Sequence, residues 1–484
     1  MAQRDGARAV VVGGGMAGLV AARTLAARGL QVTLLERSGA CGGSVQSREL
    51  GGFRLDSGAE SFSTRSGTVP ALAADLGLAD RIVAPEAGGA WVQLPGRQLA
   101  RTALRLPATG IFGIPADPTD PAVAAAVGRS GALRASLDRV LPVGSLATRP
   151  GVSLGELVRT RMGPGVLAKL VAPVTNGVLS ANPEDLDADA VAPGLRAAVA
   201  KHGSLGAAVS ALRNAAPAGS AVGGLRGGMA LLTHALVAEL QQAGVDLRLN
   251  ESAVRVDLGA HGWTTETEHS TLRRGLDSAG LLVATDGPAA IDLLQQVFPA
   301  LADERPAEGP GVALVTLLVD VPELDASPRG TGVLVANGVA GVEAKALTHA
   351  TAKWAWLREE TGPGCHILRL SYGRAGDTSS ATGPGTSDAR LFRHALRDAS
   401  ALLGVPVAAA DVLDWDVVRW TGTLPHAAVG HSERVKRIRE VIAAAPGLEV
   451  TGAWLAGTGL VSVIDDARER ATALADRMGC PPIA

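Results

Sequence analysis

Hydrophobic and polar residues follow three successive patterns at the start of the chain. Residues 8–12, RAVVV, form a short apolar run that is typical of a buried strand. Residues 16–28 then carry apolar side chains at helical spacing, and Gly29 ends the predicted helix. Residues 31–36, QVTLLE, predict a second strand. The chain therefore opens with a predicted βαβ unit, as an α/β fold does.

Strand patterns return in the second half of the chain. A glycine cluster at 223–228 precedes a predicted helix over 229–242, and the two short strands after it, 245–249 and 253–256, are expected to pair with each other. Further strands are predicted over 280–284, 312–319, 332–335, 366–372 and 448–454. The strands within 312–372 suit a sheet that forms one wall of a ligand site.

A stretch of helical character separates these strand regions. Strand signals disappear from about residue 104 to 161, where Pro-rich turns precede helical runs such as 122–141. The apolar, weakly charged runs in this stretch motivate the hypothesis that it touches a membrane surface. A closing helix is predicted over 465–477.

The clearest motif is Gly13-x-Gly15-x-x-Gly18, which lies between the first strand and the first helix and is followed by Glu36 at the end of the second strand. Gly13 permits a tight turn, Gly15 lets the backbone approach a pyrophosphate, and Gly18 lets the helix pack on the strand. The helix N-terminus stabilises phosphate charge, and Glu36 accepts the ribose hydroxyls. The alternative is an ordinary glycine turn, but this context favours a dinucleotide site.

The residues after Glu36 distinguish FAD from NAD. Gly42 and Gly43 form a second glycine pair, which would bring another loop to the same pyrophosphate. This arrangement resembles the flavin-containing amine oxidase and porphyrinogen oxidase superfamily. Residues 51–62, GGFRLDSGAESF, resemble the superfamily segment that runs beneath the flavin ring. The resemblance implies FAD, bound non-covalently, rather than NAD.

Several distant segments resemble one branch of that superfamily, the oxygen-dependent coproporphyrinogen III and protoporphyrinogen IX oxidases of haem biosynthesis. They span nearly the whole chain in order: 175–178 (TNGV), 182–186 (NPEDL), 203–205 (GSL), 227–229 (GGM), 346–348 (ALT), 353–354 (KW), 419–420 (RW), 424–425 (LP), 430–431 (GH) and 452–460 (GAWLAGTGL). The chain departs from the usual pattern at 425–427 and 461–463, both near the expected flavin or porphyrin site.

The resemblance implies an α/β fold with three parts. These are a Rossmann-like FAD-binding domain of the p-hydroxybenzoate-hydroxylase type, a mixed β-sheet substrate domain and an inserted helical region. The FAD-binding domain is expected to be assembled from residues 1–55, 222–290 and 445–484. The substrate domain is expected to comprise residues 56–100, 200–221 and 291–444. Residues 101–199 are the expected helical insertion and membrane-contact region.

The implied reaction is the six-electron oxidation of coproporphyrinogen III to coproporphyrin III, by hydride transfer to flavin N5 and reoxidation by dioxygen with release of hydrogen peroxide. Protoporphyrinogen IX is the alternative substrate, and hand-off of the product to a ferrochelatase is an expected partnership. A flavin amine oxidase, a carotenoid desaturase and a non-catalytic flavoprotein partner remain as further alternatives. The single tyrosine supplies the aromatic cage of an amine oxidase poorly.

The resemblance also implies which residues contact FAD. Val254 matches the position that holds the adenine, Trp420 a position near the flavin, and a helix starting near Val461 is expected to point its N–H groups at the flavin pyrimidine. The full expected set is Gly13, Gly14, Gly15, Met16, Ala17, Gly18, Glu36, Arg37, Gly42, Gly43, Ser44, Gly58, Ala59, Glu60, Ser61, Val254, Trp420, Val461, Ser462 and Val463.

Few other side chains are expected to take part in the chemistry. Arg65 is the candidate cation for a substrate propionate. Lys345 and Lys353 are candidates for a place beside the flavin, with ordinary surface lysines as the alternative. His431 is expected to be a structural histidine rather than a base. No metal is expected.

Composition narrows the classes of function. Lys and Arg number 45 against 47 Asp and Glu, so the formal net charge of -2 gives no field that would recruit nucleic acid. The three cysteines lack the spacing of a zinc site or a disulfide framework. No run of about 18 uncharged apolar residues occurs, and the opening residues lack a signal-peptide pattern. We therefore expect a cytoplasmic enzyme, at most peripheral to the inner face of the membrane.

Overall fold

A five-stranded parallel sheet forms the first part of the fold. A computed structural model describes residues 7–107, 110–214, 222–307, 309, 311–374, 385–420 and 427–480. The strands of this sheet, in spatial order, are β10 (Asp246–Leu249), β2 (Gln31–Glu36), β1 (Arg8–Val12), β14 (Gly280–Val283) and β20 (Leu448–Val450). On β1, Ala9 and Val11 enter one hydrophobic cluster and Val10 and Val12 the other. The sheet is therefore covered on both faces, as a parallel sheet requires.

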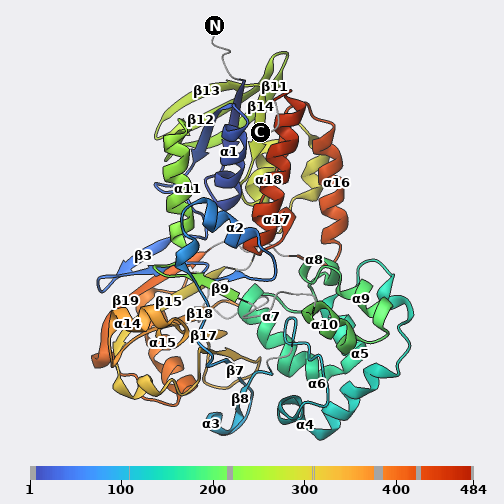
Figure 1. Ribbon diagram of the computed structural model, residues 1–484, viewed down its shortest axis with the longest axis vertical. Coiled ribbons are helices and arrows are strands. Elements are labelled where there is room, and N and C mark those ends of the chain that lie inside the picture. Colours follow the sequence, from blue (N-terminus) through green and yellow to red (C-terminus); the bar gives the residue numbers. More distant parts are fainter. Residues whose placement is uncertain are drawn as a thin grey trace.

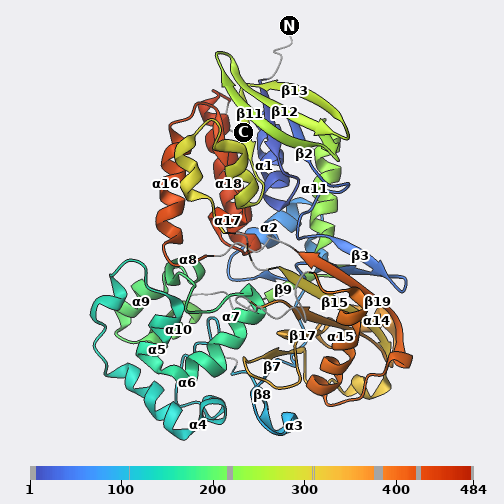
Figure 2. The ribbon, with the colours of Figure 1, turned by 180° about the vertical axis from the view of Figure 1, so that it is seen from behind.

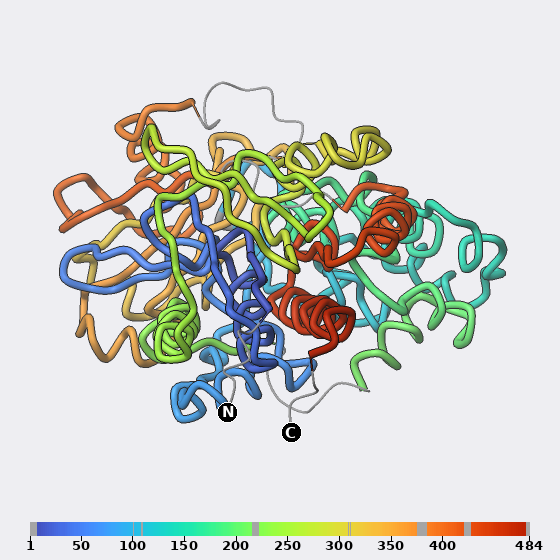
Figure 3. Tube along the Cα trace, turned by 90° about the horizontal axis from the view of Figure 1, so that it is seen from above, coloured from blue at the N-terminus to red at the C-terminus, as the bar shows by residue number. Residues whose placement is uncertain are grey.

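Helices and a second sheet provide these covers. One face carries α1 (Met16–Ala27), α11 (Ala230–Gln242) and α18 (Leu460–Arg477). The other carries α12 (Gly287–Leu294), α16 (His431–Ala443) and an antiparallel sheet of β11 (Ser252–Gly259), β12 (Gly262–His269) and β13 (Leu272–Ser278). Figure 3 shows α1 and α18 side by side, although they come from opposite ends of the chain. The predicted Rossmann-like architecture is confirmed.

Two predicted strands in this part differ from the structure. The prediction that 245–249 pairs with 253–256 is wrong, because β10 pairs with β2 and β11 pairs with β12. Asn250, with a φ of +56°, instead donates its backbone N–H to the carbonyl oxygen of Ser38, and Glu251 donates to that of Glu36, the last residue of β2. The predicted strand over 448–454 ends at Val450, because Gly452 has a φ of +135° and α17 (Ala453–Ala456) follows.

A seven-stranded sheet forms the second part. Its order is β19 (Val412–Trp420), β15 (Val312–Asp320), β18 (Cys365–Tyr372), β17 (Ala346–His349), β16 (Gly332–Val335), β7 (Ala90–Gln93) and β8 (Ala103–Arg105). The sheet is mixed, since β16 and β7 are parallel while the other neighbours are antiparallel. One face packs against α15 (Asp388–Leu403). The predicted mixed sheet is confirmed.

Helices from the middle of the chain share a third core. They are α4 (Pro121–Ser136), α5 (Leu154–Met162), α6 (Pro164–Val166), α7 (Ala172–Leu179), α8 (Ala188–Val191), α9 (Leu195–His202) and α10 (Leu205–Asn214). The predicted helix over 122–141 is interrupted, because Gly128 has a φ of +79° and the short helix η2 (Leu137–Arg139) follows α4. In the described part of the chain, we find no helix with the length and apolar character needed to cross a membrane.

The remaining short elements lie within or between these three groups, which Figures 1 and 2 show from opposite sides. They are β3 (Ser47–Leu50), β4 (Phe53–Asp56), β5 (Phe62–Ser63), α2 (Thr68–Asp75), η1 (Ala79–Arg81), β6 (Ile82–Val83), α3 (Leu99–Thr102), η3 (Gly144–Ala147), η4 (Leu167–Val171), β9 (Val222–Leu225), η5 (Pro299–Glu304), η6 (Pro322–Ala326), α13 (Ala350–Lys353), α14 (Ala355–Thr361) and η7 (Ala409–Asp411). The boundaries of the three expected domains stay a prediction.

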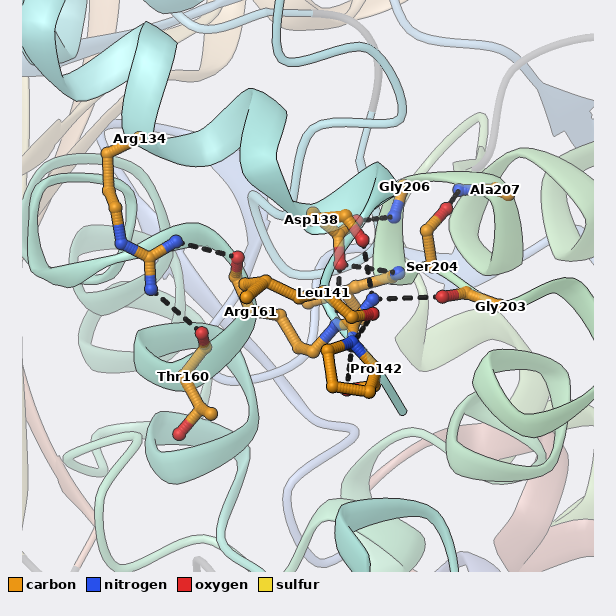
Figure 4. Close-up of polar contacts among 11 residues, drawn as sticks. Arg134, Asp138, Leu141, Pro142, Thr160, Arg161, Gly203, Ser204, Gly206 and Ala207 are labelled. Atoms are coloured by element: carbon orange, nitrogen blue, oxygen red, sulfur yellow. Dashed lines mark hydrogen bonds and ion pairs between the residues drawn. The ribbon is translucent and has the colours of Figure 1, made fainter. Parts of the chain in front are cut away.

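A buried ion pair ties the helical group together (Figure 4). Arg161 donates from Nε to Asp138 Oδ1 at 2.6 Å, and the side chains of both residues are 1% exposed. Asp138 also accepts the N–H groups of Leu205 and Gly206, at 3.0 and 2.8 Å. Arg161 donates to the carbonyl oxygen of Gly203 at 2.9 Å. Residues 203–205, one of the segments that resemble the porphyrinogen oxidases, therefore lie at the start of α10, where they contact the buried ion pair.

Candidate functional site

A cavity of about 420 Å³ lies at the carboxyl ends of the parallel strands. Open parallel α/β sheets bind ligands at this edge, in the crevice between the loops that follow the strands. The residues that line it come from both ends and the middle of the chain: Val12, Gly13, Gly15, Met16, Ala17, Leu35, Glu36, Arg37, Gly42, Gly43, Ser44, Val45, Glu251, Ser252, Ala253, Ala284, Thr285, Asp286, Gly287, Pro288, Ala289, Leu293, Pro306, Ala307, Gly309, His431, Arg434, Val435, Ile438, Gly452, Ala453, Trp454, Thr458, Leu460 and Val463.

The glycine turn between β1 and α1 forms one wall of the cavity. Gly13 has a φ of +108°, and an added Cβ there would lie 2.7 Å from the carbonyl oxygen of Ala284. A Cβ on Gly18 would lie 1.8 Å from the Gly13 carbonyl oxygen, so only glycine lets α1 pack this closely on β1. A Cβ on Gly15 would meet nothing within 4 Å. Gly15 therefore faces open space, where a phosphate can approach the start of α1.

Glu36 lies at the end of β2 and lines the same cavity. Its Oε2 atom accepts the N–H of Gly14 at 2.8 Å. Its Oε1 atom accepts the N–H and the hydroxyl of Ser38, at 2.8 and 2.7 Å. These bonds hold the carboxylate at the rim, where the sequence places the ribose of a dinucleotide.

The second glycine pair meets the first one. The N–H of Gly42 donates to the carbonyl oxygen of Gly14 at 2.8 Å, and Gly42 forms an isolated β-bridge with Gly15. A Cβ on Gly43 would lie 3.3 Å from the Cα of Gly15. The two glycine segments thus approach one cavity from two sides, which is the arrangement the sequence predicts for FAD. Arg37 and Ser44 line the cavity beside them.

The segment expected beneath the flavin does not line the cavity but contacts Ser44, which does. The N–H of Ala59 donates to the carbonyl oxygen of Ser44 at 2.9 Å, and a Cβ on Gly58 would lie 2.1 Å from that same oxygen. Trp420 donates from Nε1 to the carbonyl oxygen of Ser57 at 2.8 Å. These contacts link residues 57–59 and Trp420 to Ser44, so they lie behind a residue of the cavity wall and do not line the cavity themselves. Ser61, in the same segment, is partly exposed and does not line the cavity.

The N-terminus of α18 also reaches the cavity. Leu460 and Val463 line it, while Val461 and Ser462 of the same turn do not. Val254 lies on β11 at an irregularity in the register, and its neighbours Ser252 and Ala253 line the cavity. The contacts of Val254, Val461 and Ser462 with FAD stay a prediction.

Four other predicted residues do not line the cavity: Lys345, Lys353, Arg65 and the expected FAD contact Glu60. Lys345 is 1% exposed, and its Nζ atom donates to the Ser180 hydroxyl and to the carbonyl oxygen of Gly373. Burial, with a smaller contribution from the charge of Arg374, lowers the pKa of Lys345 to about 7. Lys353 donates to Glu60 rather than to the cavity. Arg65 is exposed after β5.

Sequence reasoning missed several residues of the site. Asp286 follows β14, so the rule that carboxyl ends of parallel strands meet would have found it. Arg434 of α16 belongs to no motif, whereas Trp454 of α17 lies in the segment 452–460, which the sequence analysis did not assign to the FAD site. Asp56 belongs to the predicted segment 51–62 and does not line the cavity; its carboxylate accepts the N–H of Met229 at 2.8 Å just before α11, and burial raises its pKa to about 6. The predicted motif 424–425, and residues 425 and 426 of the departure at 425–427, lie outside the described residues.

Comparison with known proteins agrees with this geometry. Residues 16–479 match the family model described as flavin containing amine oxidoreductase. The chain is 32% identical over 478 residues to a coproporphyrinogen III oxidase of Mycobacterium leprae, covering 96% of this chain and 97% of that protein. It is 24% identical over 494 residues to a chloroplastic protoporphyrinogen oxidase of Nicotiana tabacum, covering 96% and 84%.

A solved structure is similar over almost its whole length. This Exiguobacterium protein carries the provisional name protoporphyrinogen oxidase, and it matches with a TM-score of 0.79 at 25% identity, covering 97% of this chain and 98% of that one. The two glycine segments, the open approach to Gly15 and the held Glu36 carboxylate fit FAD, which is the cofactor. The chain therefore belongs to the flavin-containing amine oxidoreductase family and is an FAD-dependent oxidoreductase.

Proposed function

We propose that this chain oxidises coproporphyrinogen III to coproporphyrin III in haem biosynthesis, removing six electrons with dioxygen as the acceptor and hydrogen peroxide as the second product. Near full-length similarity to proteins named coproporphyrinogen III oxidase supports this reaction. Protoporphyrinogen IX is the second candidate substrate, supported by the name of the tobacco relative.

The observation that carries the proposal is a sheet face beside the FAD cavity. On β15, Leu314 and Thr316 are partly exposed, whereas their neighbours Ala313 and Val315 are buried against α15. Trp420 of the adjacent strand β19 reaches the backbone that borders the cavity. On this face Leu314 pairs with the uncharged Ser371 and Val418, whereas Thr316 pairs with the charged Arg369 and Asp416. We propose that a broad macrocycle near the flavin lies over the Leu314 end of the face.

FAD supplies the hydride acceptor for this chemistry when it is bound. The chain binds and orients the two reactants. We propose that the first N–H groups of α18 stabilise negative charge at the cavity, because Leu460 and Val463 of that turn line it. We further propose that the exposed Arg65 pairs with a substrate propionate.

The environment of the single tyrosine argues against an amine oxidase. Tyr372 is fully buried, and its hydroxyl donates to Asp398 Oδ2 at 3.3 Å. It lies in the hydrophobic cluster under α15, so it is not available for an aromatic cage around an amine. This placement supports the porphyrinogen over an amine as the substrate.

Two further parts of the proposal concern partners and location. The porphyrin product is of the class that a ferrochelatase metallates, so direct hand-off to one is proposed. We also propose a cytoplasmic enzyme with peripheral membrane contact through α4, η2 and the residue after η2, where Leu133, Leu137 and Val140 are 70%, 45% and 77% exposed. Flotation with liposomes would show a lipid-bound fraction; its absence would exclude the membrane contact.

The proposed reaction is tested with the purified FAD-loaded protein. Porphyrin fluorescence is followed under air with coproporphyrinogen III or protoporphyrinogen IX, and spontaneous oxidation is subtracted. We expect faster turnover of coproporphyrinogen III and loss of the signal without oxygen. Faster turnover of protoporphyrinogen IX would select the second substrate, and no turnover of either by FAD-loaded protein would reject a porphyrinogen oxidase.

A further inference from the structure

The backbone that borders the FAD cavity is held by a side chain from the seven-stranded sheet. Arg369 lies on β18, and its Nη1 atom donates to the carbonyl oxygens of Gly58 at 3.0 Å and Asp56 at 3.2 Å. Gly58 in turn packs against Ser44, which lines the cavity. The position of Arg369 therefore sets the position of this stretch relative to the cavity.

The guanidinium of Arg369 is itself oriented by two further charges. Its Nη2 atom lies 2.7 Å from Glu60 Oε2, and the other carboxylate oxygen of Glu60 accepts from Lys353 Nζ at 2.5 Å. The side chains of Arg369, Glu60 and Lys353 are 14%, 17% and 15% exposed. The result is a chain of contacts that runs from Lys353 through Glu60 and Arg369 to the carbonyls of Asp56 and Gly58.

The surroundings of this chain of contacts keep its geometry fixed. Lys353 Nζ lies 5.0 Å from the centre of the Trp354 ring. Trp354 and Trp356 line a small cavity of about 40 Å³ that also borders Glu60 and Arg369. Charges enclosed in this way need partners, because an unpaired buried charge is strongly unfavourable. Glu60 therefore pairs with both Arg369 and Lys353 and compensates their charges.

The carboxylate of Glu60 stays ionised over the working range of pH. Burial raises its pKa, but the charges of Arg369 and Lys353 outweigh that effect and lower the pKa from 4.5 to about 2. One negative and two positive charges leave the unit with a net charge of +1. The unit does not line the large cavity, so it acts through the backbone that it holds.

We propose that Arg369, Glu60 and Lys353 are positioning residues for bound FAD. Arg369 holds the carbonyls of Asp56 and Gly58 with the fork of its guanidinium, Glu60 orients that fork, and Lys353 fixes Glu60. The inference depends on FAD in the large cavity and not on the identity of the substrate. A change in FAD binding therefore tests this proposal without testing the proposed porphyrinogen oxidation.

The test uses Arg369→Lys, which keeps the positive charge but loses the fork that holds the backbone carbonyls. FAD affinity is measured by titrating the apoprotein, and the visible absorption spectrum of bound FAD is recorded without any substrate. We expect Arg369→Lys to weaken FAD binding at least tenfold and to change the spectrum.

A matched control separates positioning from general destabilisation. Arg28 is another buried arginine, with contacts to Asp476 and to the carbonyl oxygen of Cys480 at the far end of α1. Arg28→Lys is expected to lower the melting temperature but to leave FAD affinity and spectrum unchanged. The proposal is overturned if Arg369→Lys matches the unaltered protein in both readouts, or if Arg28→Lys changes them equally.

A second variant keeps the test decisive if Arg369→Lys does not fold. Glu60→Gln removes the charge that orients Arg369 but keeps the shape of the side chain. We expect it to weaken FAD binding at least tenfold and to shift the flavin spectrum. An unchanged affinity and spectrum in Glu60→Gln would overturn the proposal on its own.

Discussion

At the scale of single residues, a side chain is excluded from Gly18 by close packing and disfavoured at Gly29 by its backbone conformation. A Cβ on Gly18 would lie 1.8 Å from the Gly13 carbonyl oxygen, whereas a Cβ on Gly29 would meet nothing within 4 Å, although its φ is +81°. We expect Gly18→Ala to displace α1 and weaken FAD binding at least 100-fold, or ~3 kcal/mol. Gly29→Ala is expected to cost roughly 1–2 kcal/mol of stability and to leave FAD affinity unchanged.

These two variants are compared by FAD titration of the apoproteins and by denaturant unfolding. Equal FAD affinities would contradict the role assigned to close packing of α1 on β1. The comparison is informative because both glycines belong to the same helix–strand unit, one at each end of α1.

Lys345 gives a second prediction at this scale, because its pKa of about 7 lies below the ordinary value of 10.5. Above pH 7 the unfolded chain holds more protons at this residue than the folded chain, so its contribution to the unfolding free energy rises with pH up to about 10.5. Below pH 7 both states are protonated and the contribution is constant. Lys345→Met removes this dependence.

The measurement is the unfolding free energy of both proteins at several pH values between 6 and 10. We expect the difference between them to change by about 1 kcal/mol per pH unit above pH 7. A difference that does not vary with pH would show that Lys345 keeps an ordinary pKa.

At the scale of elements, the helical group depends on one buried ion pair. Arg161→Met leaves Asp138 buried without its cation, and we expect this to lower the unfolding free energy by roughly 3–5 kcal/mol. The exposed pair Arg255–Asp257 is the control, and Arg255→Met is expected to cost at most about 1 kcal/mol. Urea unfolding measures both, and similar losses would refute the special role of burial.

Elements were predicted well where the pattern is local. The bounds of β1, β2 and β16 agree with the predicted ranges, and α1 ends one residue before the predicted end. The pairing of β10 with β2 was not predictable from neighbouring residues, because its partner strand is about 210 residues earlier in the chain. Interruption of α4 at Gly128 likewise depends on packing, since an isolated glycine is tolerated in many helices.

At the scale of the whole molecule, the FAD cavity joins segments from both ends and the middle of the chain. FAD binds only when these segments are assembled, so it stabilises the folded state by mass action. We expect about 4 kcal/mol of stabilisation when free FAD is 1,000 times its dissociation constant. Thermal unfolding of apoprotein with increasing FAD measures this, and a melting temperature that does not depend on FAD would contradict the site.

The sequence by itself determined the FAD-binding unit, because glycine spacing, strand, helix and Glu36 lie within one short stretch and act on one another locally. The whole-chain resemblance extended this to the family and the cofactor. Only the tertiary structure decided which charges meet: Lys353 with Glu60, Arg369 with the backbone of Gly58, and Lys345 with Ser180. These contacts join residues that are 165 to 311 positions apart, and no local pattern encodes such long-range packing.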